Sequence, residues 1–221
     1  MSSWTALKEG FDAFTRQLPV LLGAYLVVVA VQQAVSLLIP ESLLLLEFIL
    51  DGIVTAPLVA GQYLIALKVV RKEPVVFKEL FAGLPMWGPI VGSYLLYVLL
   101  SSLATLALII PGIMVGLMLL FAPIRFLDPK EGARSLGAIE ALRESARITR
   151  GYKEILFGIG FLLGIPMVIL VVLQMRSLND PRFPAWIIEI ISLLSGALFF
   201  GPVAATSYMV VYDHALNHPR G

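Results

Sequence analysis

The long apolar runs of this chain constrain its fold more than any other feature. The first run, Pro19 to Ile39, contains no charged residue, and its length is close to the ~20 residues that a helix needs to cross a bilayer core. Of the 221 residues, 59% are hydrophobic and 14% are charged, whereas a soluble domain usually carries about 25% charged residues. A core of ordinary size cannot bury this much apolar surface. We therefore expect a single integral membrane domain over residues 1–221.

The apolar runs together predict an all-α bundle with six membrane spans. Pro111-Gly112 is expected to form the turn between the third and fourth spans, because this pair interrupts apolar sequence. Glu47 and Asp51 lie in residues 42–51, which either begin a long second span or form a short helix on the outer surface; Glu189 has the same alternatives. The surface is favoured, because burying Asp51 deeply would cost about 2.5–3.5 kcal/mol. The expected spans are Pro19–Ile39, Gly52–Leu67, Pro89–Ile110, Ile113–Leu127, Ile155–Leu173 and Ala185–Tyr212.

Three charged segments are expected to form amphipathic helices at the membrane surface: residues 1–18, 77–87 and 133–152. On the six-span map, 14 of the 16 Lys and Arg residues fall on one side of the membrane. Basic residues favour the cytoplasmic side. The sequence therefore predicts a protein of the cytoplasmic (inner) membrane with both termini in the cytoplasm.

Four basic residues beside the last of these surface helices could contact lipid head groups. They are Arg143, Arg147, Arg150 and Lys153. Attraction to anionic head groups is worth about 1 kcal/mol for each charge near the surface. Positive-inside topology alone explains the same residues, and both interpretations can hold together. Membrane lipids are accordingly the expected partners, beside a protein partner or a second copy of the chain.

Three prolines suggest an internal repeat. Pro57, Pro123 and Pro202 fall at matching places in the three predicted return spans, so a three-fold arrangement of two-span units is one hypothesis, with units 1–70, 71–130 and 131–221. The alternative is that prolines are common in membrane helices, where neighbouring groups satisfy the freed carbonyls. In a true repeat, the prolines could kink three helices around a central cavity or shape a closed bundle.

The titratable residues point to no catalytic chemistry. The chain has no cysteine, which excludes disulfides, thiolate zinc sites and a cysteine nucleophile, and a formal net charge of +1 does not attract nucleic acid. His214 and His218 have the helical spacing of a metal pair, but no further ligand cluster accompanies them, so we expect a frayed, solvated tail. We find no catalytic triad, phosphate-binding loop or pair of catalytic carboxylates, and we expect no enzyme, cofactor or metal site.

Polar side chains inside the predicted spans have two interpretations. They could line a pathway, or they could form hydrogen bonds across helices worth about 0.6 kcal/mol each. Arg125, near the inner end of the fourth span, is expected to extend to the interface and to pair with Asp128. The polar residues are Gln32, Gln33, Gln62, Tyr63, Ser101, Ser102, Thr105, Thr206 and Ser207.

Most of the chain, and residues 70–160 in particular, resembles a known group of proteins. The pattern PGI…FAP…D…G…EALRESARITRGYKEILFG and the segment VVRKEPVVFKELFAG are similar to the YciC-like bacterial membrane proteins. They also resemble the membrane domain found beside glycerophosphoryl diester phosphodiesterases. Ile148 stands where these families usually have a leucine. The resemblance implies a six-helix integral membrane fold of largely unassigned function, and it transfers no catalytic residue to this chain.

Three functions are candidates, of which an intramembrane enzyme is the least favoured because a nucleophile, a base and metal ligands are all missing. The first of the other two is a non-enzymatic membrane component that binds lipid or serves a partner protein. The second is a small transporter or permease for a lipid-like or small solute. A transporter needs a polar, accessible cavity near Pro57, Pro123 and Pro202, whereas the first role needs a packed centre and an exposed apolar face. The scarcity of buried charge favours the first.

Overall fold

The computed structural model describes residues 1–129, 137–177, 191 and 195–219. Within these ranges the chain is helical and contains no strand, which confirms the all-α class. The helices are α1 (Ser3–Arg16), α2 (Leu18–Leu38), η1 (Glu41–Leu43), α3 (Leu44–Val70), η2 (Phe77–Phe81), η3 (Leu84–Met86), α4 (Trp87–Ala107), α5 (Ile109–Leu119), α6 (Ala122–Arg125), α7 (Ala138–Ile148), α8 (Lys153–Ser177), η6 (Gly196–Phe200) and α10 (Gly201–Asn217).

Four helical segments among the described residues are long and apolar enough to cross a membrane: Leu18–Leu38, Ile49–Val70, Phe77–Ala107 and Lys153–Leu173. They correspond to four of the six predicted spans. The segment Ile109–Arg125, at the place of the fourth predicted span, is a shorter apolar helix. The sixth predicted span lies partly outside the described residues. Six spans therefore remain a prediction.

Helix α3 is the centre of the bundle. In the apolar stretch of this helix, 67% of the residues are buried inside the protein, against 17% in the apolar stretch of each of α2, α4 and α8. Helices α2, α4 and α10 and the short helix η2 all pack against α3. The three outer spans consequently leave most of their apolar surface uncovered by the protein, as expected of helices solvated by lipid.

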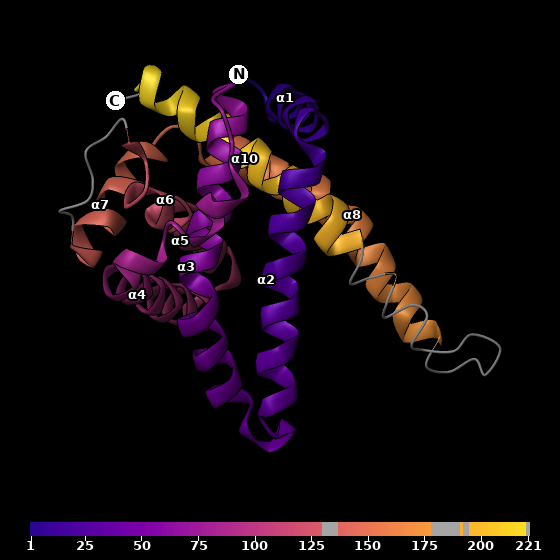
Figure 1. Cartoon of the computed structure of the whole chain (residues 1–221). Coiled ribbons are helices and arrows are strands. Elements are labelled where there is room, and N and C mark those ends of the chain that lie inside the picture. The colour runs from indigo at the N-terminus through magenta and orange to yellow at the C-terminus, as the bar shows by residue number, and fades with distance from the viewer. Residues whose placement is uncertain (130–136, 178–190, 192–194, 220–221) are drawn as a thin grey trace.

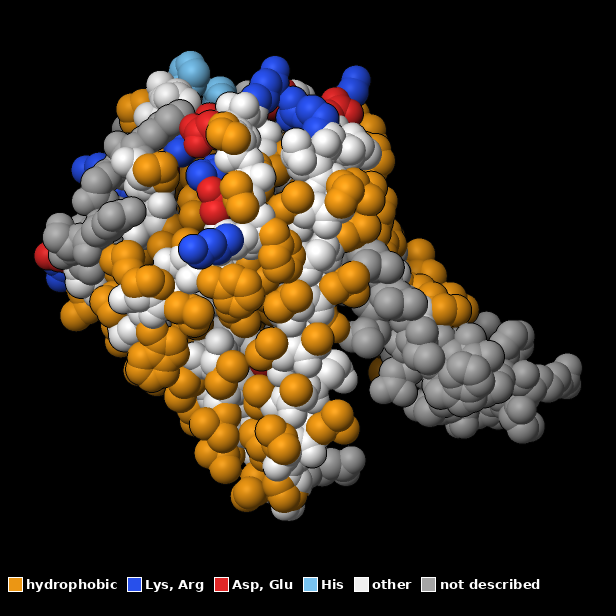
Figure 2. Space-filling model, viewed as in Figure 1, with side chains coloured by type: hydrophobic (Ala, Val, Ile, Leu, Met, Phe, Trp, Pro, Cys, Tyr) orange, Lys and Arg blue, Asp and Glu red, His pale blue; other side chains and the backbone are white. Residues whose placement is uncertain are grey.

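The two ends of the molecule differ in charge. Figure 1 shows α2 and α3 as a hairpin, with both termini at the end away from the hairpin tip. On the face shown in Figure 2, charged side chains gather toward the end with the termini, which we call the charged end, and hydrophobic side chains cover most of the rest. Helices α8 and α10 pack together and run at an angle to α2 (Figure 1).

The turn predicted at Pro111-Gly112 lies instead at Leu108. The backbone of Leu108 is extended (φ −163°, ψ 142°) between α4 and α5. Pro111 falls in the first turn of α5, where its missing N–H costs nothing because the first N–H groups of a helix have no intrahelical partner. Gly112 is buried against Thr105 of α4, so the absence of a Cβ allows the two helices to approach closely.

The predicted surface helices are only partly correct. Residues 77–87 do not form one amphipathic helix: they fold into η2 and η3, and Leu80 of η2 is fully buried against α3. Helix α7 covers residues 138–148 of the predicted 133–152 and buries Ala141, Leu142 and Ser145. Helix α1 packs its small residues against α10, and it leaves Trp4 67% exposed, as the prediction of an interfacial helix requires.

Residues 44–51 belong to the same helix as the second predicted span, because α3 runs without interruption from Leu44 to Val70. The segment is therefore not a separate helix, and the surface placement that was favoured for Glu47 and Asp51 stays a prediction. The three repeat prolines have different local settings: Pro57 is inside α3, Pro123 is in the first turn of α6, and Pro202 is in the first turn of α10 after the π-helical turn η6. The three-fold repeat stays a prediction. Glu189 lies outside the described residues.

Candidate functional site

The polar centre of the molecule is a buried group of side chains at the charged end, which we call the ion cluster. It comprises Arg71, Arg125, Asp128, Tyr212 and Asp213. Both carboxylate oxygens of Asp128 accept hydrogen bonds from the guanidinium of Arg71, at 2.7 Å and 3.0 Å. Nε of Arg71 donates to Asp213 at 2.6 Å. The phenol of Tyr212 donates to Asp128 at 3.1 Å and accepts from Arg125 at 3.2 Å.

Burial makes these interactions strong. The side chain of Arg71 is 4% exposed and that of Asp128 is fully buried, whereas Asp213 is 26% exposed. Burial lowers the pKa of Arg71, but the hydrogen bonds that Arg71 donates to Asp128 and Asp213 outweigh this effect and raise the pKa above its usual range. Two cations and two anions share the ion cluster, so their charges compensate. The cluster joins the ends of α3 and α10 to the segment that follows α6.

The sequence interpretation of this region was wrong in two respects. Arg125 was expected to extend to the interface, but its side chain is 5% exposed. Asp128 was expected to pair with Arg125, yet its bidentate partner is Arg71, which is 57 residues away in sequence. Arg71 had been counted only as a loop cation. Its position directly after the last turn of an apolar helix was the signal available in the sequence.

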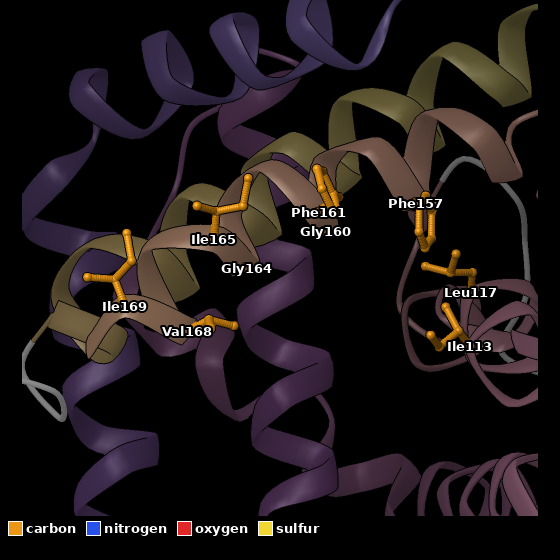
Figure 3. Close-up of a pocket in the computed structure, with 9 residues that line it drawn as sticks. All are labelled: Ile113, Leu117, Phe157, Gly160, Phe161, Gly164, Ile165, Val168 and Ile169. Carbon is orange, nitrogen blue, oxygen red and sulfur yellow. The ribbon is translucent and has the colours of Figure 1, made fainter. Parts of the chain in front are cut away.

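A second feature is an apolar groove between α5 and α8, with a volume of about 500 Å³. Ile113 and Leu117 line it from α5, and Phe157, Gly160, Phe161 and Gly164 are among the residues that line it from α8. Figure 3 shows the side chain of Phe157 directed toward Leu117 across the groove. All of the lining residues are apolar or glycine.

The α8 wall of the groove is open to the surroundings. Phe157 is 47% exposed and Phe161 is 60% exposed, although both are large aromatic side chains. A Cβ placed at Gly164 would meet no atom within 4 Å. The described residues therefore leave this side of the groove uncovered.

Two smaller cavities flank α3. One, of about 130 Å³, is lined by residues that include Tyr63, Tyr94, Tyr97 and Pro123, and the other, of about 230 Å³, by residues that include Tyr25, Gln32 and Gln62. Val59 of α3 lines both cavities.

Several of the polar side chains predicted inside spans form hydrogen bonds to helix carbonyls. Gln62 donates across the bundle to the carbonyl of Ala24 at 3.3 Å. Thr105, Thr206 and Ser207 each donate to a carbonyl one turn earlier in their own helix. The predicted hydrogen bonding across helices is thus confirmed at Gln62, whereas the other three residues bond within their own helices.

The four predicted head-group residues lie along α7 and the start of α8. Arg143, Arg147 and Arg150 are exposed and Lys153 is partly exposed. Arg147 forms an ion pair with Glu144 at 3.2 Å. Among the residues that the structure describes, the other three cations form no ion pair with a carboxylate.

The histidine pair does not belong to a frayed tail, contrary to expectation. Helix α10 continues to Asn217, the phenol of Tyr152 donates to the carbonyl of His218 at 2.6 Å, and the rings of His214 and His218 stack with centroids 4.6 Å apart. Among the described residues, no group of three or more His, Cys, Asp or Glu side chains could hold a metal ion.

Over the residues that the structure describes, the protein is helical and has four helical segments that are long and apolar enough to cross a membrane. Comparison with protein-family models, curated proteins and solved structures finds no match to this chain. The resemblance to the YciC-like membrane proteins therefore stays a prediction.

Proposed function

We propose that this protein is a non-enzymatic, six-span component of a bacterial inner membrane that binds membrane lipid in the groove between α5 and α8. Both termini and the charged end lie in the cytoplasm in this proposal, which follows from the distribution of basic residues. The observation that carries the lipid-binding role is the groove itself, because it is about 500 Å³ in volume, wholly apolar in its lining and open on one side.

A lipid chain is the natural occupant of such a groove within a bilayer. An empty groove would deprive its lining side chains of dispersion contacts on one side. Phe157 and Phe161 present ring surface to the groove, and Gly160 and Gly164 leave room beside them for a flexible chain. The charged groups of the ion cluster are engaged with one another, which supports a bracing role for them over a catalytic one.

The proposal is tested by filling the groove. Gly164→Leu places a side chain in open space and should not disturb packing. Gly88→Leu is the matched control, because Gly88 on α4 also has no atom within 4 Å of a built Cβ and does not line the groove. Native mass spectrometry of gently purified protein should find fewer retained lipids in the Gly164 variant and wild-type retention in the control. Equal retention in all three proteins would reject the groove as a lipid site.

A transporter is the second candidate, and the two cavities that flank Val59 favour it. The chain is free of cysteine, so Val59→Cys provides a unique label. Rapid reaction with a membrane-impermeant thiol reagent in intact vesicles would indicate a water-filled path beside α3 and support transport. Protection from the reagent would indicate a packed centre and favour the lipid-binding role.

A further inference from the structure

One face of α8 connects the groove to a positive charge. Phe157, Phe161, Gly164 and Val168 line the groove at intervals of three and four residues, so they share one face of the helix. Lys153 is four residues before Phe157 and lies on the same face, one turn closer to the charged end. Its side chain is partly exposed. A cation therefore follows directly after the apolar wall.

A second cation follows the end of α7, which packs against α5. The hydroxyl groups of Ser145 and Thr149 both donate to the carbonyl of Met118, at 2.8 Å and 3.3 Å. Met118 is the neighbour of Leu117, which lines the groove. These hydrogen bonds fix the end of α7 against α5. Arg150 follows Thr149 directly and is exposed.

We propose that the site selects an anionic phospholipid, with an acyl chain in the groove and the phosphate group beside Arg150 and Lys153. This inference rests on the proposed lipid-binding function and deepens it by naming the lipid class. Arg147 is not included, because Glu144 already engages it. A zwitterionic lipid brings an ammonium group to the same cations, and this group is repelled.

Charge also argues against a second copy of the chain as the occupant. Gly160 and Gly164 have the spacing of a helix-packing motif, so a dimer through α8 is the obvious competitor. Two copies in one membrane have the same orientation, and a two-fold interface places the same residues opposite each other. Lys153 would then face Lys153 of the second copy without a compensating acid on that face of α8. A lipid phosphate neutralises this charge instead.

The experiment uses the full chain, delipidated in detergent and offered an equimolar mixture of phosphatidylglycerol and phosphatidylcholine with identical acyl chains. Native mass spectrometry then gives the ratio of the two bound lipids. Because each near-surface charge changes affinity by roughly fivefold, wild type should prefer phosphatidylglycerol by about tenfold or more. The double variant Arg150→Gln/Lys153→Gln should still bind lipid but lose most of this preference.

The matched control is Arg143→Gln/Arg147→Gln, which removes the same charge from α7 at residues outside the proposed phosphate site and should keep the preference. The inference is overturned if wild type binds both lipids equally. It is also overturned if the two double variants lose the preference for phosphatidylglycerol to the same extent. A dimer that forms without bound lipid overturns it in favour of self-association. Failure of the proposed lipid-binding function would give a different result from failure of this inference. Neither wild type nor any variant would then retain lipid, and Gly164→Leu would have no effect.

Discussion

Neutralising Asp128 should destabilise the fold more than neutralising Asp213, the other acid of the ion cluster. Both carboxylate oxygens accept from Arg71, and one also accepts from Tyr212. The side-chain amide of Asp128→Asn has the same shape as the carboxylate but only one acceptor oxygen. In either orientation of the amide, its NH₂ group therefore faces an N–H of the Arg71 guanidinium. Breaking a buried ion pair costs about 3–5 kcal/mol. Because Arg71 keeps Asp213 as a partner, we expect a loss of about 2–4 kcal/mol.

The assay is reversible unfolding in mixed micelles with increasing sodium dodecyl sulfate, followed by circular dichroism. Asp213→Asn is the comparison, because this carboxylate is 26% exposed and accepts one hydrogen bond from Arg71. Water can replace part of that bond, so the expected loss is only about 1 kcal/mol. The ratio between the two variants tests whether burial governs the energy of the ion cluster.

A double-mutant cycle gives the decisive result. Arg71→Met/Asp128→Leu removes both charges, so neither remains buried without its partner. The double variant should lose less stability than the sum of the single variants, by about 1–3 kcal/mol. The reasoning is refuted by strict additivity, or by an Asp128→Asn variant as stable as wild type.

Three further substitutions probe local packing. Lys72 has φ 58° after the end of α3, so Lys72→Gly should raise the free energy of unfolding by about 0.5–1 kcal/mol in the same assay; a loss would contradict the strain assigned to this backbone. Gly61→Ala would drive a methyl group into the carbonyl of Leu80 and should destabilise by about 1–3 kcal/mol, whereas Gly88→Ala, in open space, should not. Ser145→Ala leaves the buried N–H of Phe121 without its partner and removes one of the two hydroxyl donors to the carbonyl of Met118, so it should cost about 1–3 kcal/mol; an unchanged melting temperature would argue against both hydrogen bonds of Ser145.

Much of the helical content was predictable because it depends on local pattern. Apolar runs predicted α2, α3, α4 and α8, and amphipathic spacing predicted α1 and part of α7. Errors arose where local signals competed. Pro111 was taken to end a helix, although a proline is equally compatible with the first turn of one. Residues 77–87 have an amphipathic pattern, but their packing on α3 divides them into two short helices.

The candidate sites depended on tertiary structure. Arg71 contacts Asp128 and Asp213, which are 57 and 142 residues away in sequence, and many other acids in the chain were equally plausible partners. The groove exists only because α5 and α8 cross with space between them. Hydropathy and periodicity belong to each segment alone, so the sequence by itself determined the membrane class and most of the helices. Helix packing decided which charges are buried together and which apolar faces stay open, because those contacts depend on the positions of helices far apart in the chain.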